Sequence, residues 1–278
     1  MKLLRNLLKS PMFVIGAALF FGTLLFALVA PWFMNMTMDR VGEAYMAPDS
    51  EHWLGTDNLG RDYVSLLVSG LRSSLYVGFL AGTIATVTGT LLGIYGGFKG
   101  GWVDDVLNVV TNLFIVIPQF VVLILISSSM TTGRSLTLIA LIIGATGWTW
   151  SARAVRAQAA ALKSRDHISL ARINGDGTLA ILVKHILPYL LSYVFMVFII
   201  QIASGILSES AISMLGLGPL DTQSLGIILN DAKANGALSD GCWWGIFPAT
   251  ILITTIVFAL YLINTSMEGV FNPRLRRE

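Results

Sequence analysis

Apolar residues fill six long stretches of the chain, and short polar segments separate them. A helix needs about 20 mostly apolar residues to cross a hydrocarbon core about 30 Å thick. All six stretches reach that length, so the pattern predicts an all-α, polytopic membrane protein with six transmembrane helices. The stretches run approximately over residues 12–33, 74–98, 105–128, 135–157, 188–217 and 243–267.

Three of these stretches have features of their own. The first follows a basic start, as in a signal peptide, but Met12–Phe33 is longer than the 7–15 apolar residues of such a peptide. We therefore expect an uncleaved first helix. The fifth stretch contains Ser208, Glu209 and Ser210, and we expect it to tilt or bend. Pro118 predicts a bend in the third stretch.

Composition supports a membrane protein and excludes several kinds of site. The chain is 55% hydrophobic and 12% charged, whereas soluble domains carry about 25% charged residues. The single cysteine, Cys242, excludes an internal disulfide and a cysteine metal cluster. His52, His167 and His185 lie far apart, and the spacing of the histidines and acids suggests no metal site. No nucleophile–base motif indicates an enzyme, and nothing indicates a nucleic-acid partner.

Lysine and arginine are distributed unequally between the two sides that six crossings would create. With the N-terminus inside, 13 of the 18 fall in inner segments and 5 in outer segments. Positive charge marks the cytoplasmic side, so we expect both termini to be cytoplasmic. The outer cations are Arg40, Arg61, Arg72, Arg134 and Lys233.

This orientation divides the chain into three parts. Residues 1–34 form an N-terminal cytoplasmic segment and the first transmembrane helix, and residues 35–73 form an external segment. Residues 74–278 form a five-helix core with a cytoplasmic loop at about 162–187.

The external segments are rich in residues that favour turns and short helices. HWLGTDNLGRD (His52–Asp62) is dense in Gly, Asp, Asn and Thr. In the loop Pro219–Gly241, the positions of Leu225, Ile228 and Leu229 predict a short helix on the surface. These segments either contact a partner that delivers a substrate or form a packed cap over the bundle, and the sequence leaves both possibilities open.

The cytoplasmic loop interrupts two spans with a compact polar piece, SLARINGDGT, followed by ILVKHILPY. Leu170, Ile173 and the cluster 179–183 predict one apolar face on two short helices. Asp176, between two glycines, is expected to cap the second helix. Pro188 is suited to the first turn of the fifth span. Such an amphipathic piece either rests on the membrane surface or occupies a groove of another protein.

The spacing of Ala171, Gly175, Ile181 and HILP (His185–Pro188) resembles the EAA loop of ATP-binding-cassette importer permeases. Ser169 and Leu170 stand where the family pattern has Glu and Ala. Four other segments and the C-terminal NPRLRR resemble the dipeptide, oligopeptide and nickel importer permeases. The four are HWLGTDNLGRDYVSLLVSGLRSSLYVG, GGFKGGWVDDVLNVVTNLFIVIP, WTWSARAVRAQ and SESAISMLGLG.

The resemblance implies a permease subunit of an ATP-driven, binding-protein-dependent importer in a bacterial or archaeal cytoplasmic (inner) membrane. It would form half of the pathway for short peptides, or for a related solute such as an oligosaccharide or a nickel complex. The implied partners are a second permease in a heterodimer, two cytoplasmic ATPases, an external solute-binding protein and membrane lipid. ATP and Mg²⁺ would bind to the ATPases. No cofactor would bind to this chain, which has no GxxxxGK[ST] motif. The implied ATPase-coupling residues are Ala171, Gly175, Asp176, Ile181, His185 and Pro188.

Polar residues within spans are costly and often functional. We expect Asn112, Gln119 and Glu209 to face the translocation path, although Asn112 and Gln119 equally suit hydrogen bonds between helices. Glu209 either faces a water-filled cavity or pairs with a neighbour. A buried acid also allows a second class of function, a stand-alone ion- or proton-coupled transporter.

Glycines four residues apart occur twice in the second span, at Gly78 and Gly82 and at Gly89 and Gly93. Such spacing lets helices approach closely. The helix either slides or pairs across a permease interface, or it packs closely within its own bundle.

Overall fold

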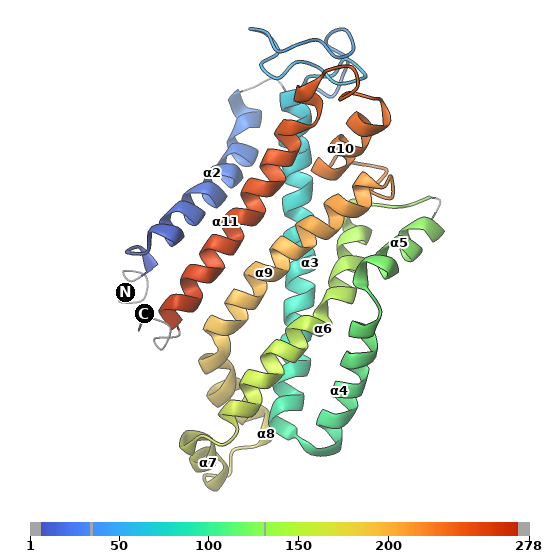
Figure 1. Cartoon of the computed structure of the whole chain (residues 1–278). Coiled ribbons are helices and arrows are strands. Elements are labelled where there is room, and N and C mark those ends of the chain that lie inside the picture. The colour runs from blue at the N-terminus through green and yellow to red at the C-terminus, as the bar shows by residue number, and fades with distance from the viewer. Residues whose placement is uncertain (1–6, 34–35, 131, 272–278) are drawn as a thin grey trace.

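The computed structural model describes residues 7–33, 36–130 and 132–271, and its regular elements are helical. Figure 1 shows them as an elongated bundle around one long helix, α3. The elements are α2 (Pro11–Phe33), α3 (Tyr63–Lys99), α4 (Gly101–Val116), α5 (Gln119–Ser129), α6 (Leu136–Leu162), α7 (Asp166–Ile173), α8 (Thr178–Ala180), the π-helix η1 (Ile181–Ile186), α9 (Leu187–Met214), α10 (Leu225–Ala234), the 3₁₀ turn η2 (Trp243–Gly245) and α11 (Phe247–Phe271). The NPRLRR segment lies outside the described residues.

Within the described residues, five helical segments are long and apolar enough to cross a membrane, and the pair α4 and α5 makes a sixth if it counts as one broken span. The prediction of an all-α, polytopic protein is therefore confirmed. The third span bends by 70° at its break, as Pro118 predicted, and Ile117 before it is extended. Helix α9 continues unbroken through Ser208–Ser210 to Met214, so the polar residues there do not interrupt the span.

The two ends of the bundle carry different elements. Figure 1 places the start of α2, the end of α11 and α7 toward one end, and segment 36–62 with α10 toward the other. This arrangement agrees with an even number of crossings. The end that carries α7 is the predicted cytoplasmic end.

Helix α3 begins at Tyr63 rather than at residue 74, so part of the segment assigned to the outside is helical. Asp62 caps it, because its carboxylate accepts a hydrogen bond from the backbone N–H of Ser65 at 2.9 Å. With 37 residues it is about 55 Å long, more than a membrane requires. It ends at Gly100, where φ is +68°.

The glycines of α3 lie where other helices approach it. A Cβ at Gly82 would lie 2.9 Å from the backbone N of Ile202 in α9. A Cβ at Gly89 would lie 2.4 Å from the Cβ of Ser151 in α6. Close packing within the bundle therefore explains these glycines.

Replacing Gly89 with alanine is expected to destabilise the bundle, because α6 has no room for a Cβ there. Overpacking of this kind typically costs about 1–3 kcal/mol. Gly22→Ala is the matched control, because nothing lies within 4 Å of a Cβ at that position. Thermal denaturation in detergent measures both variants. Equal midpoints for the two would contradict the packing described here.

Candidate functional site

The loop between α6 and α9 is an ordered structure, and a glycine sets its first turn. Helix α7 ends where the backbone N–H of Gly175 donates to Arg172 and that of Asp176 donates to Ala171, both at 3.0 Å. Gly175 has a φ of +86°, which favours glycine after a helix. The role of Gly175 is therefore to shape the turn.

Asp176 does not cap the second helix, contrary to expectation. The residue before α8 is Gly177, and no side chain caps that helix. The Oδ2 of Asp176 lies 3.0 Å from the Nε2 of His185 in η1 instead. This contact joins the turn after α7 to the start of the next span.

The π-helix η1 leads directly into α9, and Pro188 is the second residue of α9. Proline has no N–H, and within an α-helix its ring clashes with the carbonyl four residues earlier, here that of Lys184. The wider π turn before the proline accommodates its ring. In this turn the backbone N–H of Leu187 donates to the carbonyl of Leu182, five residues earlier. Pro188 thus begins the span as predicted.

The inner side of the loop is packed onto the bundle. Ile168, Ala171, Ile181 and Ile186 are buried in one apolar cluster with side chains of α3, α6 and α9. The Arg172 guanidinium also lies 5.1 Å from the centre of the Phe98 ring of α3. Ala171 and Ile181 therefore fix the loop to the bundle.

The outer side of the loop exposes four apolar side chains. We call them the coupling face. Only part of the predicted apolar face belongs to it, because Ile181 is buried and Leu182 packs, partly buried, against the same inner cluster. The exposed fractions are 60% for Leu170, 80% for Ile173, 74% for Leu179 and 53% for Val183.

The predicted path residues Asn112 and Gln119 both bond to α6. The Nη2 of Arg153 donates to the Oδ1 of Asn112 at 2.6 Å, and the Nε2 of Gln119 donates to the Oγ1 of Thr146 at 3.2 Å. A bidentate ion pair between Asp104 and Arg156 adds to this connection. These contacts hold α4 and α5 against α6 on both sides of the 70° bend.

Gln201 of α9 belongs to the same polar region and was not predicted. Its Nε2 donates to the carbonyl of Gly147 in α6 at 2.9 Å, and the side chain is buried. Its pairing partner lies 54 residues away in the chain. A polar residue isolated in an apolar run was the only signal in the sequence.

Glu209 is fully buried and separate from that region. Its carboxylate accepts hydrogen bonds from Ser74 of α3 at 3.1 Å and from Ser213 at 2.7 Å. The Ser74 hydroxyl also accepts a bond from the backbone N–H of Leu225, at the start of α10. Glu209 therefore pairs with neighbours, and this network joins α3, α9 and α10.

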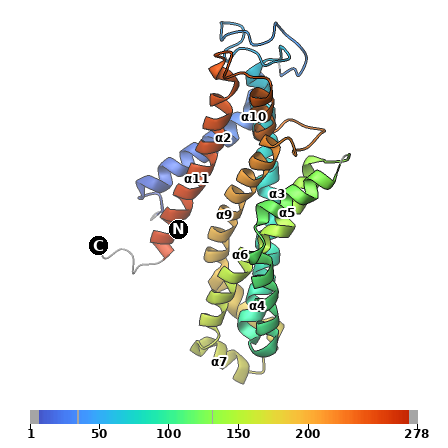
Figure 2. The same ribbon diagram turned by 45° about the vertical axis from the view of Figure 1, so that its right-hand side comes forward.

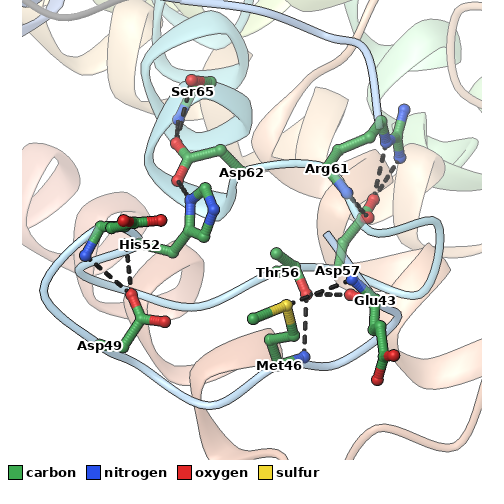
Figure 3. Close-up of polar contacts among 10 residues, drawn as sticks. Glu43, Met46, Asp49, His52, Thr56, Asp57, Arg61, Asp62 and Ser65 are labelled. Atoms are coloured by element: carbon green, nitrogen blue, oxygen red, sulfur yellow. Dashed lines mark hydrogen bonds and ion pairs between the residues drawn. The ribbon is translucent and has the colours of Figure 1, made fainter. Parts of the chain in front are cut away.

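The external segment is a folded cap, shown in Figure 3. Asp57 accepts bonds from the backbone N–H of Arg61 at 2.8 Å and from its guanidinium at 2.6 Å. Asp62 lies between His52, at 3.1 Å, and Ser65. The backbone N–H groups of His52 and then Glu51 lower the pKa of a further acid of this cap, Asp49.

Helix α10 completes the cap from the other side. The predicted short helix is present, but Leu225 and Ile228 are buried against the bundle. The Oδ2 of Asp231 lies 4.0 Å from Arg61, and burial raises the pKa of this acid. The external segments therefore form a packed cap over the bundle.

These features define a multi-pass helical membrane protein with a folded cap at one end and an ordered loop at the other. Residues 89–277 match the family described as "Binding-protein-dependent transport system inner membrane component". The chain belongs to this family, which confirms the resemblance seen in the sequence. It is a permease subunit of such a system and a multi-pass protein of the inner membrane.

Relatives from several bacteria cover most of the chain. The oligopeptide transport system permease protein OppC of Escherichia coli K12 is 36% identical over 91% of this chain and 83% of its own length. OppC of Mycobacterium tuberculosis H37Rv is 31% identical over 82% of this chain and 78% of its own. The dipeptide transport system permease protein DppC of Bacillus subtilis 168 is 28% identical over 98% of this chain and 85% of its own length.

Proposed function

We propose that this permease carries short peptides and is driven through its coupling face by separate ATPase subunits. The observation that carries the proposal is the coupling face, four exposed apolar side chains on a loop whose inner side is anchored. Apolar side chains on short helices suit a groove of a partner protein. The assignment of a peptide cargo rests on the relatives, which are dipeptide and oligopeptide permeases and match almost the whole chain.

The packing of the loop explains how force would reach the spans. The inner side of α7 and η1 contacts the ends of α3, α6 and α9 together. Closely packed helices move as rigid bodies rather than deform continuously. A displacement of the coupling face by an ATPase would therefore move these three helices and switch the side on which the pathway opens.

We place the wall of the pathway at α4 and α5. Both helices leave large apolar side chains exposed, including Leu113, Val116 and Phe120. Asn112 and Gln119 act here by fixing the two halves of this broken span to α6. Glu209, buried among hydroxyl groups, has a structural role in this proposal.

A second permease facing α4 and α5 would complete the pathway, and the external cap is the surface available to a solute-binding protein.

Purification in mild detergent, followed by mass spectrometry and transport assays, tests this proposal. We expect a second permease and one or two ATPases with Walker motifs to elute with this chain. In proteoliposomes with the binding protein, ATP should drive uptake of a radiolabelled tripeptide, and excess unlabelled peptide should compete. A chain that purifies alone would contradict the ATPase coupling. Competition by an oligosaccharide or nickel only would overturn the peptide assignment and leave the coupling intact.

A further inference from the structure

Two cavities adjoin on one side of the bundle, between α9 and α11. One has a volume of about 440 Å³, lies at the α7 end of the molecule and is lined by both polar and apolar side chains, including Arg165 and Glu268. The other has a volume of about 750 Å³, and all but one of its lining residues are apolar. Ser192 lines both cavities, and Met267 of the second precedes Glu268 of the first. The two therefore form one continuous site that is polar at one end and apolar along the rest.

The orientation of this site matches that of a lipid. Its polar end lies where α6 meets α7, at the predicted cytoplasmic boundary of the membrane. Tyr189 and Tyr193 line that end, and tyrosine favours the headgroup level. The apolar part runs between α2, α9 and α11, and Figure 2 shows α2 and α11 standing apart from α9 toward the α7 end. Aromatic rings line it, those of Phe13, Phe20, Phe21, Phe79, Phe195 and Phe198.

The polar end carries two opposite charges, Arg165 and Glu268. Both residues are exposed, and no ion pair within the described part of the chain involves them. A guanidinium binds a phosphate with charge-assisted hydrogen bonds. A carboxylate accepts hydrogen bonds from a primary ammonium group, which has three donors. A headgroup with a phosphate and a primary amine satisfies both charges.

We propose that this site binds a phospholipid with a primary-amine headgroup. The phosphate lies at Arg165, the ammonium group at Glu268, and an acyl chain along the phenylalanine-lined groove. A purely apolar transmembrane helix of a partner subunit would fill the groove but match neither charge. The site thus selects a phospholipid by the primary amine of its headgroup, independently of the transported solute.

Native mass spectrometry of the purified protein, with whatever subunits accompany it, tests the headgroup assignment. The protein is stripped of lipid and exposed to mixed micelles of phosphatidylethanolamine, phosphatidylcholine or phosphatidylglycerol. We expect phosphatidylethanolamine to bind about tenfold more tightly than the other two, which corresponds to about 1.4 kcal/mol. Arg165→Gln should weaken its binding by a similar factor. Glu268→Gln should remove the preference over phosphatidylcholine, whose ammonium group has no N–H to donate.

Two control variants remove an exposed charge elsewhere, Lys184→Gln and Asp105→Asn, and both should leave lipid binding unchanged. Equal binding of the three lipids, or no effect of either test variant, would overturn the proposal. A photo-crosslinker attached to the cysteine of a Phe195→Cys variant identifies the occupant of the groove without either charge variant. An adduct with the mass of a phosphatidylethanolamine supports the site, and an adduct with a second permease shows that a partner helix occupies the groove instead.

Discussion

Replacing Leu179 with aspartate is expected to reduce ATP-driven uptake at least a hundredfold while the chain remains folded and inserted. Leu179 is 74% exposed in this chain, so a charge there costs little folding energy. In an apolar groove of an ATPase the same charge would be desolvated without a partner, at a cost of several kcal/mol. Uptake into proteoliposomes, together with the amount of ATPase that co-purifies, measures the effect.

Leu220→Asp is the matched control, because Leu220 is 60% exposed in the loop before α10, at the other end of the bundle. It should leave ATPase binding unchanged. Ala171 would be a poor test of docking, since it is buried and an aspartate there would disturb the anchoring cluster. Normal uptake in Leu179→Asp would contradict the proposed coupling face.

Replacing Glu209 with leucine is expected to destabilise the protein by about 2–4 kcal/mol. The change removes the acceptor for the hydroxyls of Ser74 and Ser213 inside a fully buried junction. Each buried polar group left without a partner costs about 1–3 kcal/mol. Thermal denaturation in detergent should show a midpoint lower by roughly 5–15 °C.

Glu209→Gln separates this structural role from proton coupling. Glutamine has nearly the same size and keeps an acceptor for the same hydroxyls. We expect its stability to lie close to that of the unchanged protein and its ATP-driven uptake to persist. Loss of uptake with unchanged stability would contradict a purely structural role and show that transport requires a charge or a proton on Glu209.

The spans could be predicted from the sequence because lipid imposes a simple requirement on length and polarity. The start of α3 could not, because its first turns are buried by protein. Tyr63 and Leu66 pack beneath the cap and α10, and Arg72 on the exposed side lowers the local hydropathy. A hydropathy pattern measures suitability for lipid and does not detect a helix that other segments cover.

The loop was located correctly, but its orientation required the structure. The motif residues Ala171 and Gly175 anchor and shape the loop, whereas their neighbours Leu170 and Ile173 form the exposed side. A π turn changes the helical phase before α9, so periodicity alone could not assign the inward position of Ile181.

Long-range polar pairs were also beyond prediction. Glu209 and Ser74 are 135 residues apart, and Gln201 and Gly147 are 54 apart. In the sequence, Glu209 suited both a position facing a water-filled cavity and pairing with a neighbour. In the folded chain it faces hydroxyl groups on α3 and α9.

Site-specific cross-linking from the coupling face tests the central claim most directly. Cys242 is the only cysteine, so a Cys242→Ser background carrying Leu179→Cys gives one reactive site. A short photoactivatable reagent is attached to it in membranes of the native host, and the adducts are identified by mass spectrometry. We expect one dominant adduct, with an ATPase that contains a Walker motif. An adduct with lipid alone would place the loop on the membrane surface and contradict the proposal that an ATPase drives this permease through its coupling face.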